Sequence, residues 1–433
     1  MRHSLTFKMI LLFFLPLILM QELHQISHSV IHAFLARLQN PKETIASFSI
    51  SFAFVTTFSG ISSVCIQACI GFVKDRDSFW HLTRFFSTVG LTVFFMIELI
   101  ALTPLSHTLF GTWMGAGTEV VRHGQTASAI MGLWILPILA RNLCYGLAMI
   151  HRRTVLITNA TIVRLAALGV FLLLFPLWLE GAAAGGAALV GCMTVEAVYM
   201  LFVVRPFYRT LATDTGTPHS FYDIWKFSWP LMITQSSENG VAFIINFFLG
   251  QLSSPDLALA AFGIVYGLVR VILAPLRNLV QTAQTLLHTR TDLLTMLKFT
   301  SGLLLFFVLL IWGMFHTPLR IWILEGVMGL PLELSRYLTP AVKLIFLIAV
   351  FWGFAALFRG VLSAMRQTHF LAISAGLRLS VVTLIGSITF IDPHLNGAVV
   401  GVLAICGAFT AETLILGWKI RDRAKGVEPL FAS

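Results

Sequence analysis

The chain has 433 residues, of which 57% are hydrophobic and 11% are charged, whereas an ordinary soluble domain has about 25% charged residues. So few charged side chains cannot cover a soluble protein of this length, and a lipid bilayer is the expected surrounding. The formal net charge of +10 does not indicate nucleic-acid binding, because the Lys and Arg residues are scattered between apolar segments.

Apolar runs long enough to cross about 30 Å of hydrocarbon as a helix recur along the whole chain. In chain order they lie near residues 9–36, 45–73, 85–103, 125–150, 154–179, 182–204, 227–250, 258–286, 299–316, 338–364, 369–391 and 396–418. The first run resembles a secretory signal, but no small-residue cleavage site follows it, so we expect it to be retained. The pattern predicts an all-α polytopic membrane protein with twelve transmembrane helices.

The distribution of Lys and Arg predicts the topology. If the N-terminus is cytoplasmic, most of these residues, Arg359 among them, flank the helices on the cytoplasmic side. Such a bias places both termini in the cytoplasm. We expect the protein in the plasma (cytoplasmic or inner) membrane.

The second half of the sequence repeats the first at an offset of 214 positions. Aligned sets are Pro16, Leu17 and Gln21 with Pro230, Leu231 and Gln235; Arg164 with Arg378; and, after a slip of two, Glu196 with Glu412. An even number of spans in each half predicts a parallel repeat with a pseudo-twofold axis along the membrane normal. The expected domains are a six-helix bundle over 1–208, a cytoplasmic linker over 209–226, and a second bundle with a basic tail over 227–433.

Polar side chains lie along one stripe of the first span and its counterpart in the seventh. The first stripe holds Gln21, His24, His28 and His32, with Glu22 beside it, and the second holds Gln235, Glu238, Asn239 and Asn246. Polar groups inside a bilayer mark either a cavity lining or helix-to-helix hydrogen bonds. The histidine spacing also allows a metal site, but no carboxylate or cysteine set accompanies it, so no metal and no cofactor are expected.

Arginines inside the spans predict an anion path. Arg270 and Arg277 lie on one helical face of the eighth span, which Gln281, Gln284 and His288 continue. Arginine stays charged and binds carboxylate or phosphate in a forked geometry. Further candidates for substrate binding are Arg141, Arg164 and Arg378, with Gln21, Gln235 and Asn239. The alternative is that these arginines pair with Glu98, Glu196, Glu238 and Glu412 and lock the helices together.

Four residues of the polar stripes are candidates for ion coupling. Carboxyl and imidazole groups in a low dielectric can exchange protons near neutral pH, and the candidates are Glu22, His24, His28 and Glu238. Pro16 and Pro230 lie early in corresponding helices, where proline bends or breaks a helix.

Three segments carry a family resemblance: Phe227-Ser-Trp-Pro-Leu231, Gly360 to Leu379, and Asn396 to Gly401 leading to Glu412. With the repeat, they resemble the multidrug/oligosaccharidyl-lipid/polysaccharide (MOP) flippase superfamily, and within it most closely the progressive ankylosis family. The resemblance implies two six-helix bundles around a V-shaped cavity, and export of anions such as pyrophosphate, citrate or nucleoside triphosphates. The related multidrug and toxin extrusion (MATE) transporters exchange cationic drugs for sodium ions or protons through acidic cavity residues, and Glu22 fits that pattern.

The expected function is secondary active transport by alternating access, with a small anionic solute and a possible coupling ion, by a monomer. The alternatives are a cation-coupled multidrug antiporter of the MATE type, a lipid-linked precursor flippase, and an intramembrane enzyme. The sequence has no Asp-rich metal motif, nucleophile elbow or phosphate-binding loop, so neither an enzyme nor an ATP-driven pump is expected.

Overall fold

The computed structural model describes residues 5–35, 37–38, 40–58, 60–113, 118–213 and 220–425, and within these ranges every regular element is helical. The α-helices are α1 (Phe7–Leu35), α2 (Pro41–Phe58), α3 (Gly60–Phe72), α4 (Arg76–Ala101), α5 (Thr118–Gly132), α6 (Ile135–Ile150), α7 (Val155–Leu174), α8 (Gly181–Thr210), α9 (Phe221–Leu249), α10 (Pro255–Leu273), α11 (Leu279–Leu286), α12 (Arg290–Phe315), α13 (Leu319–Ile321), α14 (Leu332–Lys343), α15 (Ile345–Ala364), α16 (His369–Gly386) and α17 (Gly397–Lys425). Short π or 3₁₀ segments are η1 (His107–Trp113), η2 (Phe175–Leu177), η3 (Ala274–Asn278), η4 (Trp322–Val327) and η5 (Ser387–Phe390).

Ten segments of the described chain are helical, long and apolar enough to cross a membrane. They include most of the expected spans, among them Arg76–Ala101, Val155–Leu177 and Arg290–Phe315. The two expected spans outside this set, 45–73 and 227–250, are helical over α2 with α3 and over α9. The composition and these helices indicate an integral, multi-pass membrane protein.

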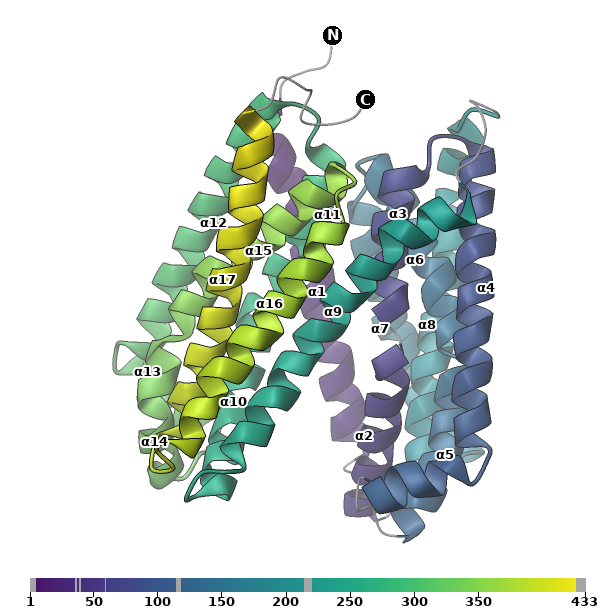
Figure 1. The fold of residues 1–433 in the computed structure, drawn as a ribbon. Coiled ribbons are helices and arrows are strands. Elements are labelled where there is room, and N and C mark those ends of the chain that lie inside the picture. The colour runs from purple at the N-terminus through teal and green to yellow at the C-terminus, as the bar shows by residue number, and fades with distance from the viewer. Residues whose placement is uncertain are drawn as a thin grey trace. The chain divides into compact units, whose positions relative to one another are not determined.

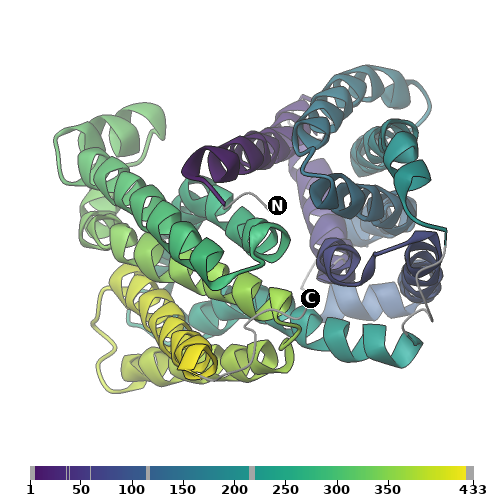
Figure 2. The same cartoon turned by 90° about the horizontal axis from the view of Figure 1, so that it is seen from above.

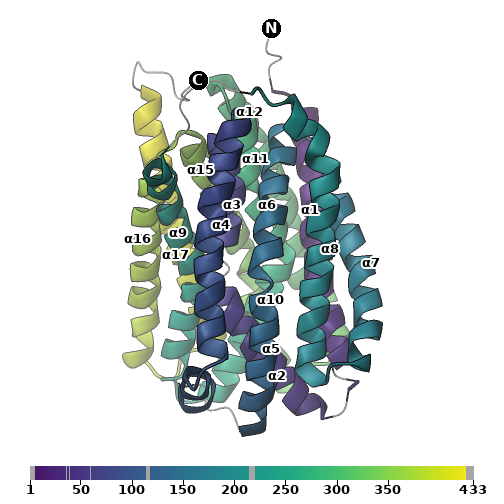
Figure 3. The ribbon, with the colours of Figure 1, turned by 90° about the vertical axis from the view of Figure 1, so that its right-hand side faces the viewer.

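The chain divides into two compact units, each a bundle of long helices (Figures 1 and 2). Unit 2 comprises Leu15–Ser228, and unit 1 comprises Met1–Phe14 together with Trp229–Ser433. Within unit 2, α4, α6 and α8 run alongside one another (Figure 3). Within unit 1, α17 packs between α15 and α16.

Both divisions between the units fall inside a helix, one residue before a proline. The first lies before Leu15 in α1 and the second before Trp229 in α9, which are 229 − 15 = 214 residues apart. The division differs from the expected bundles, because the start of α1 belongs to unit 1, where the rings of Phe7 and Phe14 lie 5.0 and 5.8 Å from that of Phe299 in α12. α8 ends at Thr210 and α9 begins at Phe221, so helix extends into both ends of the expected linker.

A 3₁₀ segment interrupts the eighth expected span and changes its polar face. Pro275 lies in the first turn of η3, and because proline has no N–H it removes a helical hydrogen bond there. The prediction of one continuous polar face from Arg270 to His288 is therefore wrong. Gln284 is buried, and His288 lies beyond the end of α11.

Glycines allow close helix packing at corresponding places in the two units. A Cβ at Gly360 of α15 would lie 2.5 Å from the carbonyl oxygen of Val280 in α11, and one at Gly146 of α6 would lie 2.4 Å from Cβ of Cys69 in α3. These glycines are 360 − 146 = 214 positions apart. Only a residue without a side chain fits between such backbones.

We expect Gly360→Ala to destabilise the protein by about 1–3 kcal/mol, because backbone atoms must move to admit the methyl group. The matched control is Gly376→Ala in α16, where nothing lies within 4 Å of an added Cβ. Thermal unfolding in detergent measures both. An equal change in the two variants would contradict the packing argument.

Candidate functional site: two buried ion clusters

The interior of unit 2 contains an ion cluster built on the carboxylate of Glu196 in α8. Glu196 is fully buried, and it accepts hydrogen bonds from Arg141 at 2.9 Å and from the Tyr145 hydroxyl at 2.6 Å. Nη1 of Arg164 in α7 lies 3.6 Å from the same carboxylate. Because burying an unpaired charge is costly, these contacts hold α6, α7 and α8 together. Arg141, Tyr145, Arg164 and Glu196 are called the unit 2 cluster below.

His24 of α1 joins the edge of the unit 2 cluster. Nη1 of Arg164 lies 3.0 Å from Nδ1 of His24, and Nη2 of Arg164 donates to the Ser27 hydroxyl at 3.1 Å. Arginine has only donors, so Nδ1 of His24 must be the acceptor and carries no proton in this state. A protonated imidazole would place two cations in contact, and the hydrogen bond to Arg164 would be lost.

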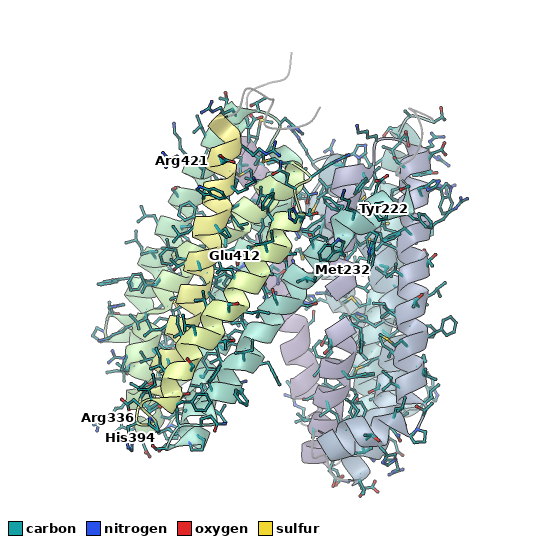
Figure 4. All side chains as sticks on the ribbon, in the orientation of Figure 1. Tyr222, Met232, Arg336, His394, Glu412 and Arg421 are labelled. Atoms are coloured by element: carbon teal, nitrogen blue, oxygen red, sulfur yellow. The ribbon has the colours of Figure 1, made fainter. Side chains whose placement is uncertain are left out.

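Unit 1 contains a corresponding cluster with two carboxylates. The buried carboxylate of Glu412, midway along α17 (Figure 4), accepts from Arg359 of α15 at 2.6 Å and from Arg378 of α16 at 2.8 Å. Arg359 also donates to the carboxylate of Glu238 in α9. Glu238, Arg359, Arg378 and Glu412 are called the unit 1 cluster below, and its two positive and two negative charges balance.

Arg277 of η3 lies at the accessible edge of the unit 1 cluster. Its Nη2 lies 3.6 Å from Oε2 of Glu238, and its side chain is 35% exposed, against 7% for Glu238. The guanidinium also lies over the Trp352 ring, 5.4 Å from the centroid. A separation of 3.6 Å is an ion pair but not a hydrogen bond. Among the described residues no hydrogen bond to the Arg277 side chain is found, so its guanidinium is held there only by this long ion pair and by the Trp352 ring.

The repeat offset relates the two clusters residue by residue. Arg164 corresponds to Arg378 (378 − 164 = 214) and Glu196 to Glu412 (412 − 196 = 216), so both clusters share one arginine–glutamate pair. At the same offset of 214, His24 corresponds to Glu238 and Tyr145 to Arg359.

An extra positive charge remains in each unit, but in different surroundings. In unit 2 the extra charge arises because two arginines, Arg141 and Arg164, face the single carboxylate of Glu196. Arg141 is buried, and it donates to Asn142 and Glu196. In unit 1 it is Arg277, which is partly exposed. Of these two charges, the one in unit 1 is thus the more exposed.

The other predicted site residues fall outside the clusters. Arg270 is exposed on α10, its guanidinium lies 5.9 Å from the centroid of the Tyr266 ring, and no ion pair to it is found within the described ranges. Gln281 is half-buried in the first turn of α11, and its Oε1 has no hydrogen-bond partner in the part of the chain that is described. The side chains of three further candidates are also half-buried: Gln21, Glu22 and Gln235. The side chains of His28, His32 and Asn239 lie outside the described part of the structure.

Sequence reasoning missed Arg359. The charge distribution predicts that it flanks a helix on the cytoplasmic side, whereas in the structure it is 4% exposed and contacts two carboxylates. The apolar run continues past it to Ala364, which is the signal that could have placed it inside the span. Arg141, Arg164 and Arg378 lie in buried ion pairs, as in the helix-locking alternative, and Glu98 is not among their partners.

The sequence matches no family model and no curated protein. Its structure is similar over 98% of the chain to a MOP superfamily transporter from Pyrococcus furiosus, with 97% of that chain covered, a TM-score of 0.80 and 14% identity. A MATE transporter in complex with MaD3S gives a TM-score of 0.81 at 13% identity, with 98% of this chain and 97% of that one covered. The eukaryotic MATE transporter AtDTX14 gives 0.76 at 11% identity, with 96% and 95% covered.

The chain has the MATE fold. Coverage near the full length of each neighbour means that both units of the MATE fold are present. The two ion clusters therefore lie in the interior of the two units of a MATE-like protein, one in each.

Proposed function

We propose that the protein is a secondary active transporter that works by alternating access and exports a small organic or phosphate-bearing anion. Pyrophosphate, citrate and nucleotides are the candidate solutes, as expected for a relative of the progressive ankylosis family. The MATE-like fold supports a transporter, since its structural neighbours are transporters. The Pyrococcus furiosus neighbour is described as having a binding pocket of reverse polarity that suggests a different function, which agrees with a non-drug solute.

The observation that carries the anion proposal is the state of Arg277. Its guanidinium is partly exposed, lies against a fully balanced cluster, and is without a hydrogen bond among the described residues. A carboxylate or phosphate could accept two parallel N–H bonds from it at 2.7–2.9 Å. The proposed further contacts are Arg270 on α10 and the side-chain amide of Gln281 on α11, the two helices that flank η3. Oε1 of Gln281 has no hydrogen-bond partner among the described residues. Arg141, Arg164 and Arg378 would act as scaffold for these groups.

A ligand-stabilisation screen of the purified protein tests the solute class. Phosphate esters and di- and tricarboxylates are expected to raise the melting temperature, and cationic dyes are not. The alternative function, a cation-coupled multidrug antiporter, is favoured by Glu22, a half-buried carboxyl in α1 for which no ion pair is found in the described ranges. Stabilisation by dyes alone would replace the anion proposal with this alternative.

For ion coupling we propose protons, taken up at His24, with Glu22, His28 and Glu238 as the other candidates. His24→Asn is expected to abolish transport driven by a pH gradient while the protein stays folded, because the amide oxygen can still accept from Arg164 but cannot take up a proton. Proton flux in vesicles with a trapped pH dye measures the effect. His123→Asn on α5 is the control, and wild-type proton flux in His24→Asn would remove His24 from the coupling path.

A further inference from the structure

The carboxylate of Glu238 has two different environments at its two oxygens. Oε1 contacts the buried guanidinium groups of Arg359 and, at 3.8 Å, Arg378. Oε2 lies 3.6 Å from the partly exposed Arg277. Two buried arginines therefore anchor Glu238 through one oxygen, while its other oxygen faces the arginine that we propose for substrate binding.

The contact between Glu238 and Arg277 is long, at 3.6 Å, and it is the only contact of Oε2 of Glu238 found among the described residues. It is longer than a hydrogen bond, whereas the contacts of Glu412 with Arg359 and Arg378 are 2.6 and 2.8 Å. An anion with two oxygens, approaching from the exposed side of Arg277, could form two charge-assisted hydrogen bonds of normal length. Such an anion has to overcome the attraction of the Glu238 carboxylate for the same guanidinium.

The corresponding place in unit 2 lacks this arrangement. His24 stands where unit 1 has Glu238, and Ser63 stands where unit 1 has Arg277 (277 − 63 = 214). The extra arginine of unit 2, Arg141, donates to Asn142 through Nε and Nη2 and to Glu196 through Nη1. A carboxylate facing an accessible arginine is thus a feature of unit 1.

From these contacts we infer that Glu238 is an intramolecular competitor, which occupies Arg277 in the empty protein and which the substrate must outcompete. This inference rests on the proposed function and adds to it the chemistry of the substrate group, a carboxylate or phosphate with at least two free oxygens. Glu238 stays anchored by Arg359 when the substrate binds, so it sets the threshold for binding without leaving its place. Anions that accept a hydrogen bond from the guanidinium through a single oxygen would bind too weakly to displace the Glu238 carboxylate.

The test is the affinity of purified full-length protein for inorganic pyrophosphate, measured by calorimetry in detergent at constant ionic strength. Glu238→Gln keeps an oxygen for Arg359 but removes the negative charge beside Arg277. Its dissociation constant for pyrophosphate is expected to fall about tenfold. This change is small compared with the Coulomb interaction of two buried charges, because Arg277 is partly exposed. In the Arg277→Ala background the same substitution should give no gain.

Glu412→Gln is the matched control, because it removes the same charge from the same cluster but does not contact Arg277. Its affinity for pyrophosphate should stay within about twofold of the wild type, since Glu412 makes no contact with Arg277 and the Coulomb interaction between two charges falls with their separation. Should Glu238→Gln fail to fold, Glu238→Asp keeps the charge, draws the carboxylate back by one methylene, and should tighten binding about threefold by the same argument.

The outcomes separate this inference from the proposed function. If pyrophosphate binding depends on Arg277 but is unchanged in both Glu238 variants, Glu238 is not a competitor. The proposed anion transport would not be affected by that result. Absent binding, or binding unaffected by Arg277→Ala, would overturn the proposed function itself. Phosphatidate in mixed micelles is the second probe. Arg277-dependent stabilisation by this lipid and none by pyrophosphate would show that the group recognised is a lipid headgroup, which would overturn the proposed small anion. The competitor role of Glu238 would then require tighter lipid binding by Glu238→Gln, and unchanged lipid binding would overturn it.

Discussion

Replacing Arg277 with alanine is expected to reduce anion transport in reconstituted vesicles by about 10- to 100-fold, the range that corresponds to about 1.5–3 kcal/mol for hydrogen bonds to a charged group. The reason is that the Arg277 guanidinium is partly exposed beside the unit 1 cluster, and in the described residues it forms no hydrogen bond that the substitution would break. The protein should therefore stay folded, with a melting temperature near that of the wild type.

Two further variants make the Arg277 experiment specific. Arg277→Lys keeps the charge but not the forked geometry, so transport should be intermediate. Arg122→Ala removes an exposed arginine that pairs with Glu119 at 2.7 Å, and transport should be unchanged. Full transport by folded Arg277→Ala protein would exclude this residue from the site.

Replacing Glu196 with alanine is expected to destabilise the protein by about 3–5 kcal/mol, the cost of leaving buried charges without a partner. Arg141 and Arg164 would keep no carboxylate within the described part of unit 2, and the Tyr145 hydroxyl would lose its acceptor. Unfolding in detergent, followed by helical circular dichroism, measures the loss.

A control for Glu196 comes from the surface of the same unit. Glu119→Ala removes the carboxylate of the exposed pair with Arg122 and should give no measurable change in stability. Replacing Glu196, Arg141 and Arg164 together by apolar residues of similar size should recover much of the lost stability, because no buried charge is then left unpaired. Equal stability of Glu196→Ala and the wild type would show that the cluster does not hold unit 2 together.

The two clusters differ in composition, and we propose that the two units have different roles in transport. Unit 2 has one carboxylate and a histidine whose Nδ1 accepts from Arg164, a state that one proton would change. Unit 1 has a balanced cluster with an accessible arginine at its edge. Proton uptake is therefore proposed in unit 2 and anion binding in unit 1. The variants His24→Asn and Arg277→Ala test the two parts separately.

Sequence alone determined the helical, membrane-embedded character of the chain, because apolar length and the scarcity of charge depend only on local composition. It also singled out Arg277, Glu238 and His24, since a polar residue within an apolar run is conspicuous without any knowledge of its neighbours. The offset of 214 residues paired Arg164 with Arg378 in the same way.

Only the tertiary structure decided which arginines are paired. Arg378 and Arg277 are the same residue type in similar apolar runs, yet one is fully buried against Glu412 and the other is partly exposed beside Glu238. Arg359 was misplaced because its partners, Glu238 and Glu412, are 121 and 53 residues away in the sequence. The availability of a charge depends on contacts between distant helices, and no local pattern records those contacts.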